Sequence, residues 1–125
     1  MKRCTIENVA VYIINKHNQF GKNLNVTKLQ NLLYLTNKAL GELGFTDQYE
    51  RWQFGPSYPK IYYAYRIYGT NIPTQCCLPS IYGISEKDYD EKEIPTEAKK
   101  IIDESLEKYF NYTTADLVRI TRGIL

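Results

Sequence analysis

The sequence predicts a mainly α-helical fold: a single compact helical domain of about five helices, with a short extended or two-stranded β element around residues 48–54. Apolar residues recur at helical spacing in several segments, and Gly or Pro stands near the ends of most of them. The chain has 125 residues, which suits one domain over residues 1–125 that buries a core without a metal or a disulfide.

The first two helices have the clearest periodicity. Thr5 is a suitable N-cap for the first, and Gly21 follows its end; its apolar stripe is Ile6, Val9, Ala10, Ile13 and Ile14. The second follows Asn25 and closes near Gly41; its core-facing residues are Leu29, Leu32, Leu33, Thr36, Leu40 and Leu43. A short polar loop joins the two, so we expect an antiparallel pair of helices at the core.

Aromatic residues and prolines then replace the helical pattern. The segment 48–54 predicts a strand, because aromatic residues are enriched in strands; these are Tyr49, Trp52 and Phe54. Gly55 and Pro56 should end this strand. Pro59 can occupy the first turn of a third helix, with Ser57 as its cap and Gly69 as its stop.

The last third of the chain predicts two more helices after an irregular stretch. Pro and Gly interrupt residues 70–95, and the acidic run 86–93 should be solvated, around at most a short strand. A fourth helix starts at residues 95–97 and should bury Ala98, Ile101, Ile102, Leu106 and Tyr109. A fifth starts at Thr113, where Asp116 completes a capping box, and should bury Leu117, Ile120 and Ile124.

The composition excludes several classes of function. His17 is the single histidine, and we expect it to be exposed at a helix end, so no catalytic residue is predicted and the protein is not expected to be an enzyme. Cys4, Cys76 and Cys77 lack metal-site spacing, so we expect buried thiols in a cytoplasmic protein, with no metal and no cofactor. The polar-interrupted N-terminal segment is not expected to be a signal peptide, and no apolar run reaches membrane length. A net charge of +2 is too small to indicate nucleic acid.

Twelve tyrosines are the distinctive feature of the chain. Protein interfaces are enriched in Tyr, Trp and Arg, because such side chains offer large contact areas at a small cost in entropy. Three tyrosines share one face of the third helix, with a Trp and two Arg close by. The predicted partner-binding residues are therefore Arg51, Trp52, Tyr58, Tyr62, Tyr65 and Arg66. The same rings could instead pack into the core, or stack on single-stranded nucleic acid, although few cations interleave with them.

Three segments together resemble a known family. Residues 9–14 are similar to its opening VAxYII helix. Residues 24–34 are similar to its LTxxKLQKLLYY segment, and include Leu29, Gln30 and Leu33. Residues 52–69 are similar to WxxGPxxPxxYxxY…YG, and match its structural positions with Gly55, Pro56, Pro59 and Gly69. This pattern resembles the Panacea domain, found in SocA-type antitoxins and GepA-like phage-associated proteins.

The resemblance implies a helical antitoxin that binds and neutralises a protein toxin, often encoded by a neighbouring gene. For SocA itself it implies a proteolytic adaptor that delivers the toxin to a ClpXP-type protease. Two departures concern Tyr58, where the family usually has a small aliphatic residue, and Arg122, which replaces a histidine. Two other functions stay open: a phage- or mobile-element-encoded protein that inhibits another host factor, and a nucleic-acid-binding autoregulator.

Overall fold

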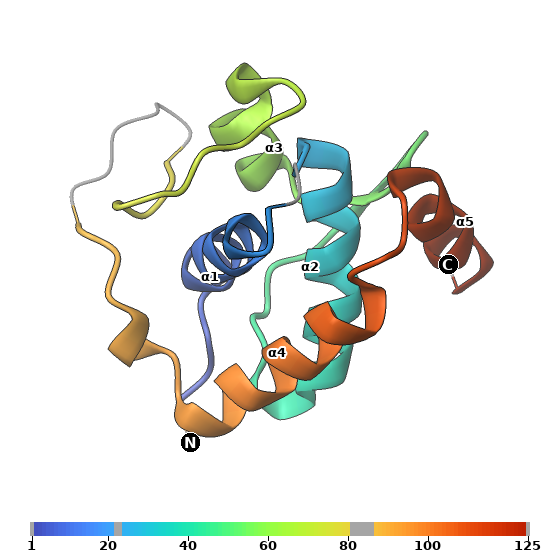
Figure 1. Cartoon of the computed structure of the whole chain (residues 1–125). Helices are drawn as coiled ribbons and strands as arrows, with labels where there is room; N and C mark the ends of the chain where they lie inside the picture. The colour runs from blue at the N-terminus through green and yellow to red at the C-terminus, as the bar shows by residue number, and fades with distance from the viewer. Residues whose placement is uncertain (1, 22–23, 81–86, 125) are drawn as a thin grey trace.

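The structure, a computed structural model, describes residues 2–21, 24–80 and 87–124. Within these residues the helices are α1 (Ile6–Gln19), α2 (Val26–Leu40), α3 (Pro59–Tyr65), α4 (Thr96–Tyr109) and α5 (Thr114–Ile124) (Figure 1). Short 3₁₀ turns follow α2 (Gly41–Leu43), follow α3 (Arg66–Tyr68) and precede α4 (Glu91–Glu93). The prediction of a mainly α-helical fold with about five helices is confirmed.

Helix α2 is the centre of the fold. It packs against α1, α3, α4 and α5, and also against β2. Asn25 begins it by accepting a hydrogen bond from the Lys28 amide at 2.8 Å, and Gly41 ends it with a φ of 58° that favours glycine. All of its predicted core residues are buried. The second apolar stripe is therefore confirmed, and it holds the other helices together.

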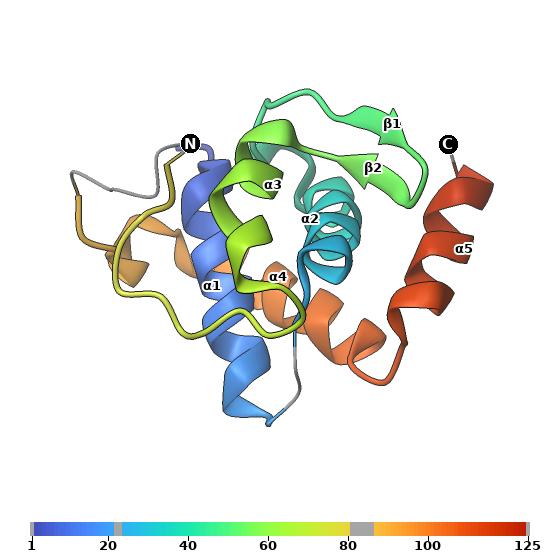
Figure 2. The ribbon, with the colours of Figure 1, turned by 90° about the horizontal axis from the view of Figure 1, so that it is seen from above.

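Helix α1 is covered on every side, which a single apolar stripe did not predict. Each residue from 8 to 14 is buried. Thr5 caps the helix as expected, and its hydroxyl accepts from the Asn8 amide at 3.3 Å. The expectation of an antiparallel pair is wrong, because the axes of α1 and α2 cross: α1 is seen nearly end-on in Figure 1, and α2 nearly end-on in Figure 2. Residues 70–80, with α3 and α4, cover the remaining sides of α1.

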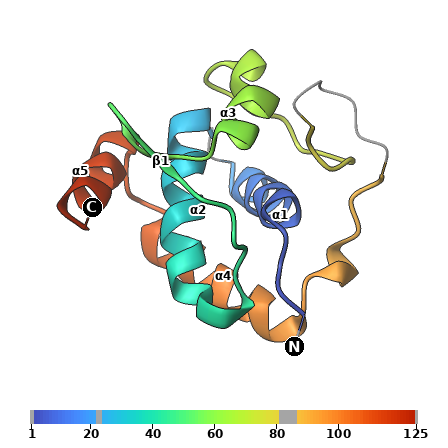
Figure 3. The same ribbon diagram turned by 180° about the vertical axis from the view of Figure 1, so that it is seen from behind.

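The β element is a hairpin that extends beyond the predicted range. Strand β1 (Glu50–Trp52) pairs antiparallel with β2 (Gly55–Ser57), in the register Trp52↔Gly55. Gly55 and Pro56 therefore form the second strand and do not end the first. Ser57 lies in β2, so the expectation that it caps α3 is wrong; Tyr58 precedes that helix without a side-chain cap. Figure 3 shows the hairpin lying across α2, between α3 and α5.

The C-terminal helices begin as predicted. In the capping box of α5 the Thr113 amide donates to Asp116 at 3.0 Å, and the Asp116 amide donates to the Thr113 hydroxyl at 3.1 Å. Leu117 is buried, but Ile124 is exposed, so its expected core position is wrong. His17 was expected at the surface, yet it is buried, because the ring of Phe110 lies 6.2 Å away and covers the end of α1.

Candidate protein-binding surface

One buried side chain joins three elements beneath the candidate surface. Asn31, on α2, donates from Nδ2 to the backbone oxygen of Phe54 at 3.2 Å, at the hairpin turn. Its Oδ1 accepts from the Thr121 hydroxyl of α5 at 2.6 Å. Asn31 and Thr121 are both fully buried. Because buried polar groups are costly when unpaired, these bonds fix the hairpin and α5 on α2.

Gly55 is required at this junction. Its φ is +105°, in the region that favours glycine. A Cβ atom here would lie 2.7 Å from Asn31 Oδ1 and 3.0 Å from Thr121 Oγ1. The glycine of the Gly-Pro motif thus lets the hairpin lie directly on the Asn31–Thr121 hydrogen bond.

Gln30 fixes the start of α3. Its Oε1 accepts from the Tyr58 amide at 2.9 Å, and its Nε2 donates to the Tyr58 carbonyl at 3.2 Å. Pro59 then occupies the first turn. Leu29 and Leu33 on α2 are buried, and Ile61 of α3 is buried as well. Gly69, with a φ of +63°, follows the 3₁₀ turn that extends α3.

Two of the predicted partner-binding tyrosines lie inside the protein. Tyr58 and Tyr65 are only 3% and 1% exposed. The ring of Tyr58 packs edge-on against Phe45, with 5.4 Å between centroids. Burial raises the pKa of both phenols above the usual value. For Tyr58 and Tyr65 the alternative of packing into the core therefore holds, because the short helix α3 needs their large rings to fill its core-facing side.

The remaining rings form a continuous row at the surface. The ring of Tyr62 lies 5.0 Å from that of Trp52 and 5.4 Å from that of Tyr63, in edge-to-face geometry. The Arg66 guanidinium stacks over Tyr63 at 4.9 Å. We call Trp52, Tyr62, Tyr63 and Arg66 the aromatic ledge. Tyr63 is 48% exposed and was missed by the sequence analysis, although it must point outward once Tyr65 points inward.

Two hollows share Thr27 and Phe54, and the smaller of them lies beside the aromatic ledge. The smaller, of about 260 Å³, is lined by Thr27, Gln30, Trp52, Gln53, Phe54, Ser57 and Tyr62. The larger, of about 1120 Å³, lies between α5, the start of α2 and the end of the turn after α3. Phe54 and Thr27 line both hollows, and Arg119 and Arg122 line the larger one. Arg51, the remaining predicted contact, is exposed on β1.

Neither a metal centre nor a membrane span is found in the described part of the chain. Across residues 2–21, 24–80 and 87–124, no three His, Cys, Asp or Glu side chains gather closely enough to hold a metal ion. No helix among these residues has the length and apolar character needed to cross a bilayer.

Comparison with known proteins identifies the family. The model of the SocA-like antitoxin family with the Panacea domain matches residues 29–123. The matched region runs from the start of α2 through the hairpin and the aromatic ledge to the end of α5. No curated protein and no solved structure matches the chain. The match covers most of the sequence, so the chain belongs to the family of SocA-like antitoxins with a Panacea domain.

Proposed function

We propose that this protein is an antitoxin that neutralises a protein toxin by binding it through the aromatic ledge. The observation that supports this proposal is the row of Trp52, Tyr62 and Tyr63 at the surface, ended by Arg66. Tyr, Trp and Arg are the side chains that most often dominate binding energy at protein interfaces. Membership of an antitoxin family supports a protein as the partner.

The scaffold beneath the aromatic ledge is suited to binding without rearrangement. Trp52 is held by the hairpin and Tyr62 by α3, and Asn31 and Gln30 attach those two elements to α2. Rings that are already in place lose little entropy on binding. The small hollow beside Trp52 could receive one apolar side chain of the toxin, while Arg119 and Arg122 would attract acidic groups over the larger hollow.

The proposed partner is the product of a neighbouring gene, and the test measures both neutralisation and affinity. Cells that express that product alone should stop growing, and co-expression of the antitoxin should restore growth. Titration calorimetry with the purified pair should give a complex at micromolar or lower concentration. Trp52→Ala and Tyr62→Ala should each weaken binding by about 30-fold, the equivalent of about 2 kcal/mol. Tyr62→Phe keeps the ring and should lose much less.

Phe20 offers the matched control. It is 62% exposed and lines a separate hollow with Phe110, so Phe20→Ala should bind the toxin like the unmodified chain. If Trp52→Ala and Tyr62→Ala bind the toxin with unchanged affinity while Phe20→Ala binds more weakly, the aromatic ledge is not the binding surface. A neighbouring product that is harmless, or that forms no complex, would overturn the antitoxin proposal itself.

Further measurements distinguish three finer alternatives for how the protein acts. Neutralisation by occlusion needs no protease, and toxin levels should then stay constant. If the protein also delivers the toxin to a ClpXP-type protease, toxin levels should fall in cells that contain both proteins and recover when the protease is deleted. Retention on single-stranded nucleic acid that falls steeply with salt would instead favour an autoregulator that uses the same rings.

A further inference from the structure

Two of the three cysteines form a pair at the surface. The Sγ atoms of Cys76 and Cys77 lie 3.6 Å apart. Cys76 is exposed and Cys77 is half-buried, whereas Cys4 is buried in the core. The expectation that all three thiols are buried is therefore wrong for the pair.

The backbone around the pair is held by hydrogen bonds on both sides. On the N-terminal side, the Gln75 amide donates to Asn15 Oδ1 at 2.9 Å, and Asn15 Nδ2 donates to the Gln75 carbonyl at 3.1 Å. On the C-terminal side, Cys77 forms an antiparallel bridge with Asp88. There the Tyr89 amide donates to the Cys76 carbonyl at 3.0 Å.

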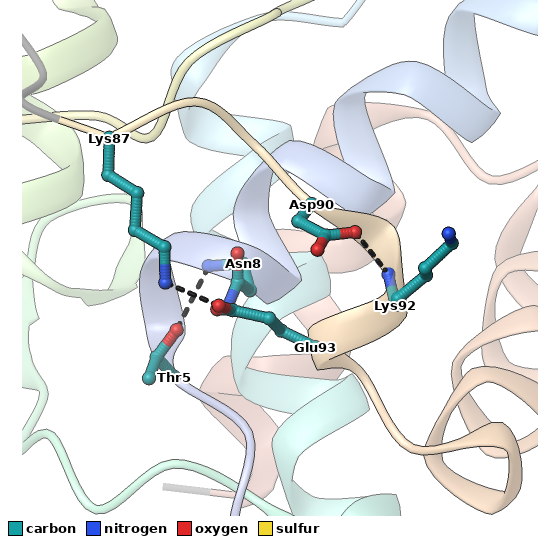
Figure 4. A network of polar contacts seen from close by, with 6 residues as sticks. All are labelled: Thr5, Asn8, Lys87, Asp90, Lys92 and Glu93. Atoms are coloured by element: carbon teal, nitrogen blue, oxygen red, sulfur yellow. Dashed lines mark hydrogen bonds and ion pairs between the residues drawn. The ribbon is translucent and has the colours of Figure 1, made fainter.

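The segment that bears Asp88 is in turn fixed to α1. Lys87 forms an ion pair with Glu93, and Asn8 Nδ2 donates to Glu93 Oε2 at 3.3 Å (Figure 4). Asp90 adds a bond from the Lys92 amide to its carboxylate at 2.9 Å. The thiol pair thus sits on a braced loop, next to a segment that is anchored to a buried helix.

We propose that Cys76 and Cys77 form a reactive vicinal dithiol, which closes to an intrachain disulfide by exchange with low-molecular-weight disulfides such as oxidised glutathione. The Cys76 thiolate attacks one sulfur of the small disulfide, forms a mixed disulfide and releases one small thiolate, which takes up a proton. The Cys77 thiolate then attacks Cys76 Sγ and releases the second small thiolate. Two electrons and two protons pass from the protein to the small disulfide, which leaves as two thiols.

The surroundings of the two thiols indicate that Cys76 reacts first with the small disulfide and Cys77 second. Cys76 is the more exposed thiol. Hydrogen bonding to Cys76 raises the pKa of the Cys77 thiol, burial adds to the effect, and the carboxylate of Asp88, 3.9 Å from Cys77 Sγ, acts in the same direction. Cys77 is therefore the poorer nucleophile toward a reagent in solution. It needs only to react with a sulfur that is already in contact.

The resulting disulfide should be easily reversed. Adjacent Cα atoms across a trans peptide are about 3.8 Å apart, whereas Cα atoms in disulfides are usually about 4.4–6.8 Å apart. Closure between neighbours therefore strains the bond, and strained, exposed disulfides are reduced more readily than structural ones. The pair would act as a reversible modification site and not as a staple of the fold.

Intact-mass spectrometry after incubation with oxidised glutathione tests this proposal. The unmodified chain should lose the mass of two hydrogen atoms and retain no adduct, because Cys77 displaces glutathione from Cys76. Excess reduced glutathione should restore the original mass. Cys77→Ser should keep one glutathione on Cys76, and Cys76→Ser should acquire its adduct more slowly.

Cys4→Ser is the matched control and should close its disulfide like the unmodified chain. Two stable adducts on the unmodified chain, or no reaction at exposed Cys76, would overturn the proposal. A Cys4→Ser variant with an unchanged urea unfolding midpoint that fails to form the Cys76–Cys77 disulfide would also overturn the proposal. These outcomes do not depend on toxin binding, so they are independent of the proposed antitoxin function.

Discussion

Substitution of Gly55 by Ala tests the packing of the hairpin on α2. The φ of +105° at this position is costly for a residue with a Cβ atom, by about 1–2 kcal/mol. The new atom would also lie 2.7 Å from Asn31 Oδ1, closer than non-bonded atoms approach. Asn31 would have to withdraw from Thr121, which it contacts at 2.6 Å. Gly55→Ala should therefore disturb a buried hydrogen bond as well as the backbone.

The second contribution to the loss of stability in Gly55→Ala comes from the disturbed hydrogen bond, because Asn31 and Thr121 are both buried. A buried polar group that loses its partner costs about 1–3 kcal/mol. Added to the backbone strain, the expected loss is about 2–5 kcal/mol, a large part of the roughly 5–15 kcal/mol that stabilises a typical domain. Urea unfolding followed by far-UV circular dichroism measures this loss as a lower midpoint, with an unchanged dependence on urea concentration.

A double-mutant cycle with Asn31→Ala separates the two contributions. Asn31→Ala removes the nearer of the two oxygen atoms that the new Cβ would meet, so Gly55→Ala in that background should cost only the backbone strain and the remaining contact with Thr121 Oγ1 at 3.0 Å. The coupling between the two substitutions should be at least about 1 kcal/mol. An equal cost of Gly55→Ala in both backgrounds would show that the contact with Asn31 plays no part, and would refute the reasoning.

Three further predictions concern stability. Thr5→Ala removes the N-cap of α1 and should lower the free energy of unfolding by about 1 kcal/mol in urea titrations, while Thr5→Ser should restore most of it. Leu33→Ala leaves a cavity beside the buried face of α2 and should cost about 2–5 kcal/mol, measured in the same way; a loss under 1 kcal/mol would contradict its core position. Hydrogen bonds from the backbone and side chain of Thr113 hold the pKa of Asp116 below its ordinary value of 3.8. A depressed pKa stabilises the fold above that value and ceases to do so as the pH falls through the folded-state pKa. The difference in urea midpoint between the unmodified chain and Asp116→Asn should therefore be constant near neutral pH and shrink below pH 3.8; a constant difference down to the lowest pH would be contrary to this expectation.

Helix caps and apolar stripes are the features that the sequence predicts best, because a local pattern of residues determines them. Thr5, Asn25 and Thr113 each cap a helix because a short polar side chain reaches the amides of its own first turn. The stripes of α1 and α2 are found correctly because apolar residues repeat at helical spacing. These features depend on residues a few positions apart, which a sequence displays directly.

Features made by distant residues could not be predicted in this way. His17 is buried beside Phe110, which follows α4 and lies 93 positions later in the sequence. Asn31 and Thr121 are 90 positions apart in the sequence, and only folding brings them together. The spacing of Tyr58, Tyr62 and Tyr65 indicated a shared face but not whether that face is inside or outside. The burial of Tyr58 and Tyr65 leaves Tyr62, joined by Tyr63, on the aromatic ledge.

We expect the Asn31 junction to couple the local opening of the hairpin to that of α5. Its side chain holds both the hairpin turn and α5, so release of one removes a partner that fixes the other. Amide hydrogens of α5 and the hairpin should then exchange with solvent through one shared opening, while those of the enclosed helix α1 should exchange only on global unfolding. A partner bound to the aromatic ledge would stabilise the hairpin, and would thereby also slow exchange at amides of α5 that it does not contact.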